Sequence, residues 1–101
     1  GEPMLQVDAA LIDALHAEGF AIAIESNGTL PVPRSIDWIC ISPKAGSELV
    51  QVNGDELKLV WPQPGSDIEW LAALDFSHRL IQPLDDPARE ANVAQCVALV
   101  Q

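Results

Sequence analysis

Basic side chains are scarce in this sequence. Five lysine and arginine residues stand against fifteen aspartate and glutamate residues, which gives a formal net charge of −10 at pH 7 and a pI near 4.2. A surface of this charge repels the phosphate groups of nucleic acids and of anionic lipids. The composition therefore argues against nucleic acid and membrane surfaces as direct partners.

Cysteine is equally sparse, and long apolar runs are missing. The two cysteines, Cys40 and Cys96, are far apart and form no close-spaced ligand pair. Metal sites and disulfide scaffolds need denser patterns, so we expect two free thiols in a reducing, cytoplasmic compartment. We see no secretory signal and no apolar run long enough to cross a membrane.

The chain is also short. Its 101 residues suffice for one domain, residues 1–101, whereas a complete eight-stranded (β/α) barrel needs about 250. The hydrophobic share of 49% with 20% charged residues is typical of a folded chain and argues against disorder. The sequence opens at Gly1 without a methionine, so we expect residues upstream of it.

One apolar run, residues 37–44, organises the rest of the chain. It reads Asp-Trp-Ile-Cys-Ile-Ser-Pro-Lys and ends abruptly in a hydroxyl, a proline and a cation. An unbroken apolar run with isoleucines is typical of a parallel strand covered on both faces. Ligands bind just past the carboxyl ends of such strands. The simpler alternative is that Ser42, Pro43 and Lys44 only form a strand-ending turn.

Strand and helix patterns alternate along the chain. Asp8 is placed to cap a helix that ends at Gly19, Ser66 or Asp67 to cap a second, and Asp86 to cap a third that Pro87 opens. Further strands are predicted over residues 20–24, 57–61 and 79–82. Residues 45–54 favour an irregular crossover, with a hairpin about Asn53-Gly54 as the alternative. This order predicts an α/β fold, a partial (β/α) barrel with about four mainly parallel strands and flanking helices.

Parallel strands gather their exits along one rim of the sheet. We expect polar side chains there that suit a small ligand bearing both an ammonium and a carboxylate. They are Glu25, Ser26 and Asn27 after the first strand, Ser42 and Lys44 after the second, Gln82 and Asp85 after the last, and Gly1 and Glu2 if a strand precedes them. The alternative is that these are ordinary polar loops. His78 is expected at the opposite rim in a structural role, and Lys58 within a strand, on a solvated edge face.

Several segments resemble 7-carboxy-7-deazaguanine synthase, a family of the radical S-adenosylmethionine superfamily. The resemblance covers essentially the whole chain but only the middle-to-late part of the family's length. The matching segments are Gly1-Glu2-Pro3 with Leu5-Gln6, residues 26–30 (Ser-Asn-Gly-Thr-Leu), residues 38–44, residues 54–60 (Gly-Asp-Glu-Leu-Lys-Leu-Val) and residues 82–85 (Gln-Pro-Leu-Asp).

The resemblance implies a lyase of queuosine and deazapurine biosynthesis. In the family, 6-carboxy-5,6,7,8-tetrahydropterin is contracted to 7-carboxy-7-deazaguanine by a radical formed when a [4Fe-4S] cluster cleaves S-adenosylmethionine, with magnesium assisting. Carried over residue by residue, the resemblance implies a cofactor-binding set in this chain. Its members are Gly1, Glu2, Asn27, Ser42, Pro43, Lys44, Gln82, Pro83, Leu84 and Asp85.

The sequence departs from the family in one decisive respect. The three clustered cysteines that hold the iron-sulfur cluster are absent, and Cys40 and Cys96 cannot replace them. We therefore expect a truncated fragment of a larger enzyme that carries part of the S-adenosylmethionine site, has no catalytic residue of its own and is inactive alone. We also expect a homo-oligomer, formed through an exposed sheet edge or apolar face. Two alternatives are a fragment of another radical S-adenosylmethionine protein, such as an activase, and a non-catalytic oligomerising α/β module.

Overall fold

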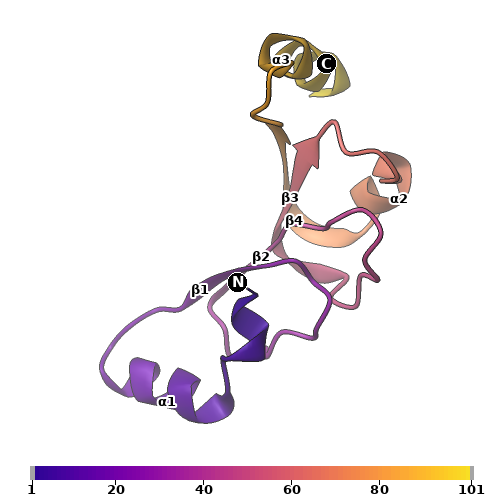
Figure 1. Ribbon diagram of the computed structural model, residues 1–101. Coiled ribbons are helices and arrows are strands. Elements are labelled where there is room, and N and C mark those ends of the chain that lie inside the picture. The colour runs from indigo at the N-terminus through magenta and orange to yellow at the C-terminus, as the bar shows by residue number, and fades with distance from the viewer. Residues whose placement is uncertain (1, 101) are drawn as a thin grey trace.

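A computed structural model describes residues 2–100 of the chain. A helix precedes the sheet and another separates its last two strands, but the first three strands follow one another with no helix between them (Figure 1). The predicted alternation of strand and helix along the whole chain is therefore wrong for that part, where irregular loops make the connections. In chain order they are the 3-10 helix η1 (Pro3–Leu5), α1 (Ala9–Ala17), β1 (Ala23–Ser26), β2 (Trp38–Ile41), β3 (Asn53–Trp61), α2 (Ile68–Ala72), β4 (Asp75–Pro83) and α3 (Arg89–Val100).

The four strands form one open sheet in the order β1-β2-β3-β4, and every neighbouring pair is parallel. This confirms the predicted α/β fold. The register sets how far each strand reaches: Ile41, the last residue of β2, is level with Leu57 of β3, whereas Trp61 at the end of β3 is level with Pro83 of β4. The second half of the sheet therefore extends beyond the first at the carboxyl end.

The bounds of three strands were predicted wrongly. The first strand begins at Ala23 rather than at residue 20, because the loop before it is exposed and the hydrogen-bonded ladder continues to Ser26. β3 and β4 each extend further toward their amino ends than predicted, and they pair with each other from Asn53 and Asp75 onward. His78 consequently lies within β4, level with Glu56, and not at the opposite rim; its ring stacks on Trp38 with centroids 5.7 Å apart.

The hairpin alternative at Asn53-Gly54 is also wrong, because both residues belong to β3. Gly54 is required there by close packing. A Cβ at this position would lie 3.0 Å from Cε1 of Phe76 and 3.1 Å from Cγ2 of Ile39. The glycine therefore permits the start of β3 to pack tightly against its two neighbouring strands.

The predicted helices form, each with an aspartate at or near its start. The Asp8 carboxylate accepts a hydrogen bond from the Leu11 amide at 2.8 Å, and Asp67 accepts one from the Trp70 amide at 3.1 Å. Before α3, Asp86 accepts from the Ala88 amide at 2.9 Å, so this helix begins at Arg89 rather than at Pro87. These carboxylates satisfy amide donors that the first turn of a helix leaves free.

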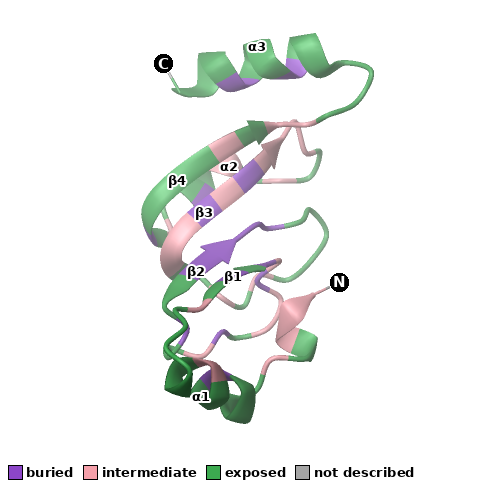
Figure 2. Cartoon of the chain, turned by 90° about the vertical axis from the view of Figure 1, so that its left-hand side faces the viewer, coloured by how far each residue is buried: buried purple, intermediate pink, exposed green. Residues whose placement is uncertain are grey.

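The core lies between the helix-facing side of the sheet and the segments that cover it. Ile12 of α1 and Leu71 of α2 are its helical members. The others are Ile24, Val32, Ile36, Ile39, Ile41, Leu57, Leu59 and Phe76. Figure 2 shows that α3 and much of β4 are exposed. The molecule is elongated, 46 × 24 × 23 Å, with α1 and α3 at opposite ends (Figure 1). No helix within residues 2–100 is long and apolar enough to span a membrane.

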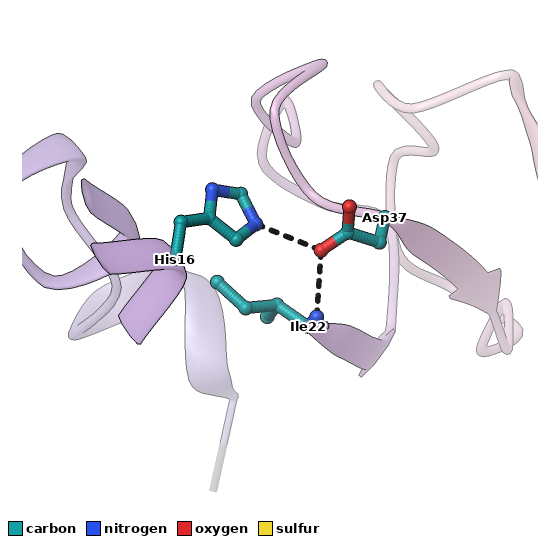
Figure 3. Close-up of polar contacts among 3 residues, drawn as sticks. All are labelled: His16, Ile22 and Asp37. Atoms are coloured by element: carbon teal, nitrogen blue, oxygen red, sulfur yellow. Dashed lines mark hydrogen bonds and ion pairs between the residues drawn. The ribbon is translucent and has the colours of Figure 1, made fainter. Parts of the chain in front are cut away.

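The amino ends of β1 and β2 are joined to α1 through Asp37 (Figure 3). One carboxylate oxygen of Asp37 accepts from the Ile22 amide at 2.7 Å and contacts Nε2 of His16 at 2.8 Å. These hydrogen bonds lower the pKa of Asp37, the one from Ile22 most strongly. This contact holds α1 at the end of the sheet away from the strand exits.

Candidate functional site

A polar cavity of about 420 Å³ lies at the carboxyl ends of β1 and β2. Its volume is within the range of small-molecule sites, about 300–1,000 Å³. Three separate chain segments line it, as the parallel sheet predicts. The lining residues are Glu2, Pro3, Glu25, Ser26, Asn27, Ser42 and Lys44.

Glu2 fastens the amino-terminal segment to the exit of β1. Its carboxylate accepts hydrogen bonds from the Asn27 amide at 2.8 Å, from the Met4 amide at 2.9 Å and from Oγ of Ser26 at 2.9 Å. Burial by itself would raise the pKa of Glu2, but these three hydrogen bonds hold it below its ordinary value. Since a carboxylate offers about four acceptor positions, Glu2 has room for about one further donor.

The turn after β1 is fixed by its own side chains. Oγ of Ser26 accepts from the Gly28 amide at 3.1 Å, and Oδ1 of Asn27 accepts from the amide and the hydroxyl of Thr29 at 3.0 and 2.7 Å. Gly28 adopts φ +77°, the left-handed region that favours glycine. The side chains of this turn are therefore held in place before any ligand arrives.

The exit of β2 places a cation beside these groups. The Ser42 amide donates to the Ser26 carbonyl at 2.8 Å, which continues the β1–β2 ladder past Ile41. Ser42 and Pro43 are buried, whereas Lys44 is exposed. Nζ of Lys44 donates to Oγ of Ser42 at 3.2 Å. The ammonium of Lys44 is thus available to an anionic group in the cavity.

Glu25 is one of three cavity residues, with Pro3 and Ser26, that the sequence-based cofactor set omitted. It accepts a hydrogen bond from Nζ of Lys58 at 2.9 Å. The sequence suggested a solvated edge face for Lys58, but β3 lies between β2 and β4 and the Lys58 side chain is only 26% exposed. The hydrogen bond to Glu25 raises the pKa of Lys58, against the opposing effect of burial. The opposite charges of Glu25 and Lys58 are visible in the sequence, but their pairing could not be predicted because it depends on the strand order, in which β2 lies between them.

The exit of β4 is built separately from the cavity. The Leu84 amide donates to the Trp61 carbonyl at 2.7 Å, and Nδ2 of Asn92 donates to the Leu84 carbonyl at 2.8 Å. Gln82 and Asp85 are exposed, and neither they nor Pro83 and Leu84 line the cavity. Their part in a shared site stays a prediction. Gly1 lies outside the described residues.

An iron-sulfur cluster does not fit the residues that the structure describes. Both cysteines are buried free thiols, Cys40 on β2 and Cys96 on α3. Residues 2–100 contain no group of three or more histidine, cysteine, aspartate or glutamate side chains arranged to hold a metal ion. The pKa of Cys40 is raised to about 12 by burial and by the neighbouring Glu56 and Glu25 carboxylates, whereas cluster ligation needs a thiolate.

S-adenosylmethionine fits the cavity better, on the chemistry of its donor set. Its amino-acid portion carries one ammonium and one carboxylate. The cavity offers the Glu25 and Glu2 carboxylates to the first and the Lys44 ammonium to the second, with Ser42 and Asn27 as hydrogen-bonding neighbours. Charge-assisted hydrogen bonds of this kind are the strongest that side chains make.

Comparison with known proteins gives a consistent result. The chain is 59% identical over 92 residues to a 7-carboxy-7-deazaguanine synthase of Burkholderia multivorans, a match that covers 91% of this chain and 44% of that protein. It is 55% identical to the 7-carboxy-7-deazaguanine synthase of Caulobacter vibrioides, a match that covers 97% of this chain and 47% of that protein. It is also 55% identical to the synthase of Bordetella pertussis, a match that covers 96% of this chain and 46% of that protein. The chain thus spans about half the length of the curated relatives it matches. No protein-family model matches it.

Proposed function

Because the chain belongs to the 7-carboxy-7-deazaguanine synthase family, we propose that its polar cavity is part of an S-adenosylmethionine site. The observation that carries the proposal is the convergence of Glu2, Glu25, Ser42 and Lys44 on one cavity at the carboxyl ends of parallel strands. When bound, S-adenosylmethionine supplies the group from which the family's radical chemistry begins. The side chains of this chain bind and orient its amino-acid portion.

Each group has a distinct task in this proposal. The Lys44 ammonium neutralises the ligand carboxylate. Oγ of Ser42 accepts a hydrogen bond from Nζ of Lys44 and thereby orients the Lys44 ammonium. Glu25 accepts from the ligand ammonium. Glu2, whose carboxylate already holds Ser26 and Asn27, mainly keeps the turn after β1 in place rather than acting as a free acceptor.

The whole-enzyme reaction belongs to the same proposal. It is the ring contraction of 6-carboxy-5,6,7,8-tetrahydropterin to 7-carboxy-7-deazaguanine, for which the cluster and the substrate contacts must come from beyond residues 2–100. We propose that residues 1–101 form one partial-barrel domain that is inactive alone and works in the cytoplasm, where free thiols such as Cys40 and Cys96 persist.

Binding of S-adenosylmethionine tests the proposal directly. Titration followed by calorimetry or by tryptophan fluorescence should give saturable binding to the unaltered chain. Lys44→Ala should weaken binding about ten- to a hundredfold, because a charge-assisted hydrogen bond contributes roughly 1.5–3 kcal/mol. Arg34→Ala, which removes an exposed cation outside the cavity, is the matched control and should leave the affinity unchanged. Equal effects of the two substitutions, or no binding by the unaltered chain at millimolar ligand, contradict the proposal.

A second proposal concerns assembly. The outer edge of β4 has no neighbouring strand in the described sheet, and α3 exposes several valines. Unpaired strand edges and apolar patches favour association. We propose that the chain forms a homo-oligomer through this end of the molecule.

A further inference from the structure

Lys58 and Glu25 are joined across the sheet although they are not on neighbouring strands. Glu25 lies on β1 and Lys58 on β3, with β2 between them. Because adjacent strands are about 4.8 Å apart, the two backbones are separated by roughly 10 Å. The lysine stem therefore crosses β2 to bring Nζ within 2.9 Å of Oε1 of Glu25.

The surroundings of Lys58 make this pairing selective. Glu25, Cys40 and Glu56 are register partners on three adjacent strands, so their side chains share one face of the sheet. Glu56 lies on the same strand as Lys58, two positions away, and is the register partner of Cys40. Lys58 pairs instead with the more distant Glu25, whose carboxylate lines the cavity. The side chain of Lys58 is 26% exposed and that of Glu25 is 55% exposed.

We propose that Lys58 is a positioning residue, which holds the Glu25 carboxylate on the cavity wall so that an ammonium-bearing ligand meets a fixed anion beside the Lys44 cation. This inference rests on the proposed function. The charges at the cavity support it. The lining carries the charges of Glu2, Glu25 and Lys44, and Lys58, which is not a lining residue, adds a second cation 2.9 Å from Glu25. A zwitterionic amino-acid group then meets a balanced site rather than a net negative one.

A double-mutant cycle on S-adenosylmethionine affinity tests the role of Lys58. Lys58→Met should weaken binding about two- to fivefold, the range that an exposed ion pair contributes. In a Glu25→Gln background the same substitution should have no further effect, because Lys58 acts through Glu25. Lys58→Arg should restore most of the affinity. Glu56→Gln, a carboxylate on the same face without a hydrogen bond to Lys58, is the matched control and should leave the affinity unchanged.

A ligand-free measurement keeps the two proposals separable. The chain has only two lysines, Lys44 and Lys58, so a sample labelled at lysine Cε gives two carbon-13 signals that Lys44→Arg assigns. Glu25 raises the pKa of Lys58, so Glu25→Gln should lower the pKa of Lys58. The titration is confined to the pH range in which circular dichroism shows that the chain is folded. Thermal unfolding of each variant verifies folding.

The outcomes lead to different conclusions. An unchanged Lys58 titration in Glu25→Gln overturns the ion pair and the inference with it. Binding by the unaltered chain at an affinity that Lys58→Met does not alter overturns the positioning role alone. Absence of binding by the unaltered chain, with the lysine titration shifted as expected, contradicts the proposed function and removes the ligand role of Lys58 while the ion pair stands.

Discussion

At the scale of single residues, Gly28 is the most constrained position of the cavity turn. It adopts φ +77°, and a Cβ added there would lie 2.5 Å from Cδ1 of Leu49 and 2.8 Å from Cγ2 of Ile41. Gly28→Ala should therefore lower the free energy of unfolding by roughly 2–5 kcal/mol, the combined cost of the left-handed backbone and of overpacking. Urea unfolding followed by circular dichroism measures this loss.

Gly46 provides the control for this substitution. Its φ is +82°, but a Cβ there would meet nothing within 4 Å. Gly46→Ala should cost only the backbone strain, about 1–2 kcal/mol. If the two alanine variants unfold at the same urea concentration, the close contact of Gly28 with Leu49 and Ile41 does not exist in solution.

The residues of the cavity were largely predictable, whereas their partners were not. Asn27, Ser42 and Lys44 follow strand patterns that the sequence displays, so their placement at one rim could be expected. That Glu2 would use its carboxylate on Ser26 and Asn27 depends on contacts between segments more than twenty positions apart. No local pattern encodes such a contact, because it follows from how η1 packs against β1.

At the scale of elements, the contact of Asp37 with His16 and Ile22 joins α1 to the sheet in a pH-dependent way. Hydrogen bonds, first from Ile22 and then from His16, lower the pKa of Asp37 from its ordinary value of 3.8. A carboxylate with a lowered folded-state pKa stabilises the fold above its unfolded pKa, and this stabilisation is lost as the pH falls through the folded pKa. Asp37→Asn should therefore destabilise the chain at pH 5–7, and the difference should shrink as the pH falls below about 4 and through the lowered folded-state pKa of Asp37.

Urea midpoints of the unaltered chain and the variant, measured from pH 2.5 to 7, give the test. His16→Ala should cause a smaller loss than Asp37→Asn, because the Ile22 amide remains hydrogen-bonded to the carboxylate. A loss in Asp37→Asn that is the same at pH 2.5 and at pH 6 contradicts an ionic origin of the effect.

The existence of each element could be predicted better than its bounds. Helix starts are marked by single capping residues: Asp8 was predicted correctly, and of the two alternatives Ser66 and Asp67 the structure uses Asp67. The amino-terminal parts of β3 and β4 carry no strand pattern: Asn53, Gly54 and Asp75 are poor strand formers. These segments become strands because each pairs with the other, a stabilisation between elements that local propensity does not contain.

At the scale of the whole molecule, register decides which strand exits share a site. Ile41 is level with Leu57, but β3 and β4 continue together to Trp61 and Pro83. The exit of β4 is therefore displaced along the sheet from the cavity that β1 and β2 form. The parallel direction of the strands was predicted correctly, although only one pair of consecutive strands, β3 and β4, has a helix between them. The offset depends on the lengths of β3 and β4.

The end of the molecule built by β4 and α3 should promote self-association. Leu80 on β4 is 50% exposed, Val97 and Val100 on α3 are 47% and 70% exposed, and β4 is an edge strand of the described sheet. Each large apolar side chain buried in an interface contributes roughly 1.5–3 kcal/mol. Sedimentation at micromolar concentration should therefore give a mass above the monomer's 10.9 kDa.

Val97→Lys combined with Leu80→Lys should restore the monomer. Val52→Lys, which alters an exposed valine in the crossover before β3, should not. If the unaltered chain is a monomer, the predicted self-association does not occur. If Val52→Lys dissociates the oligomer as well as the double variant does, the association surface is not the end built by β4 and α3.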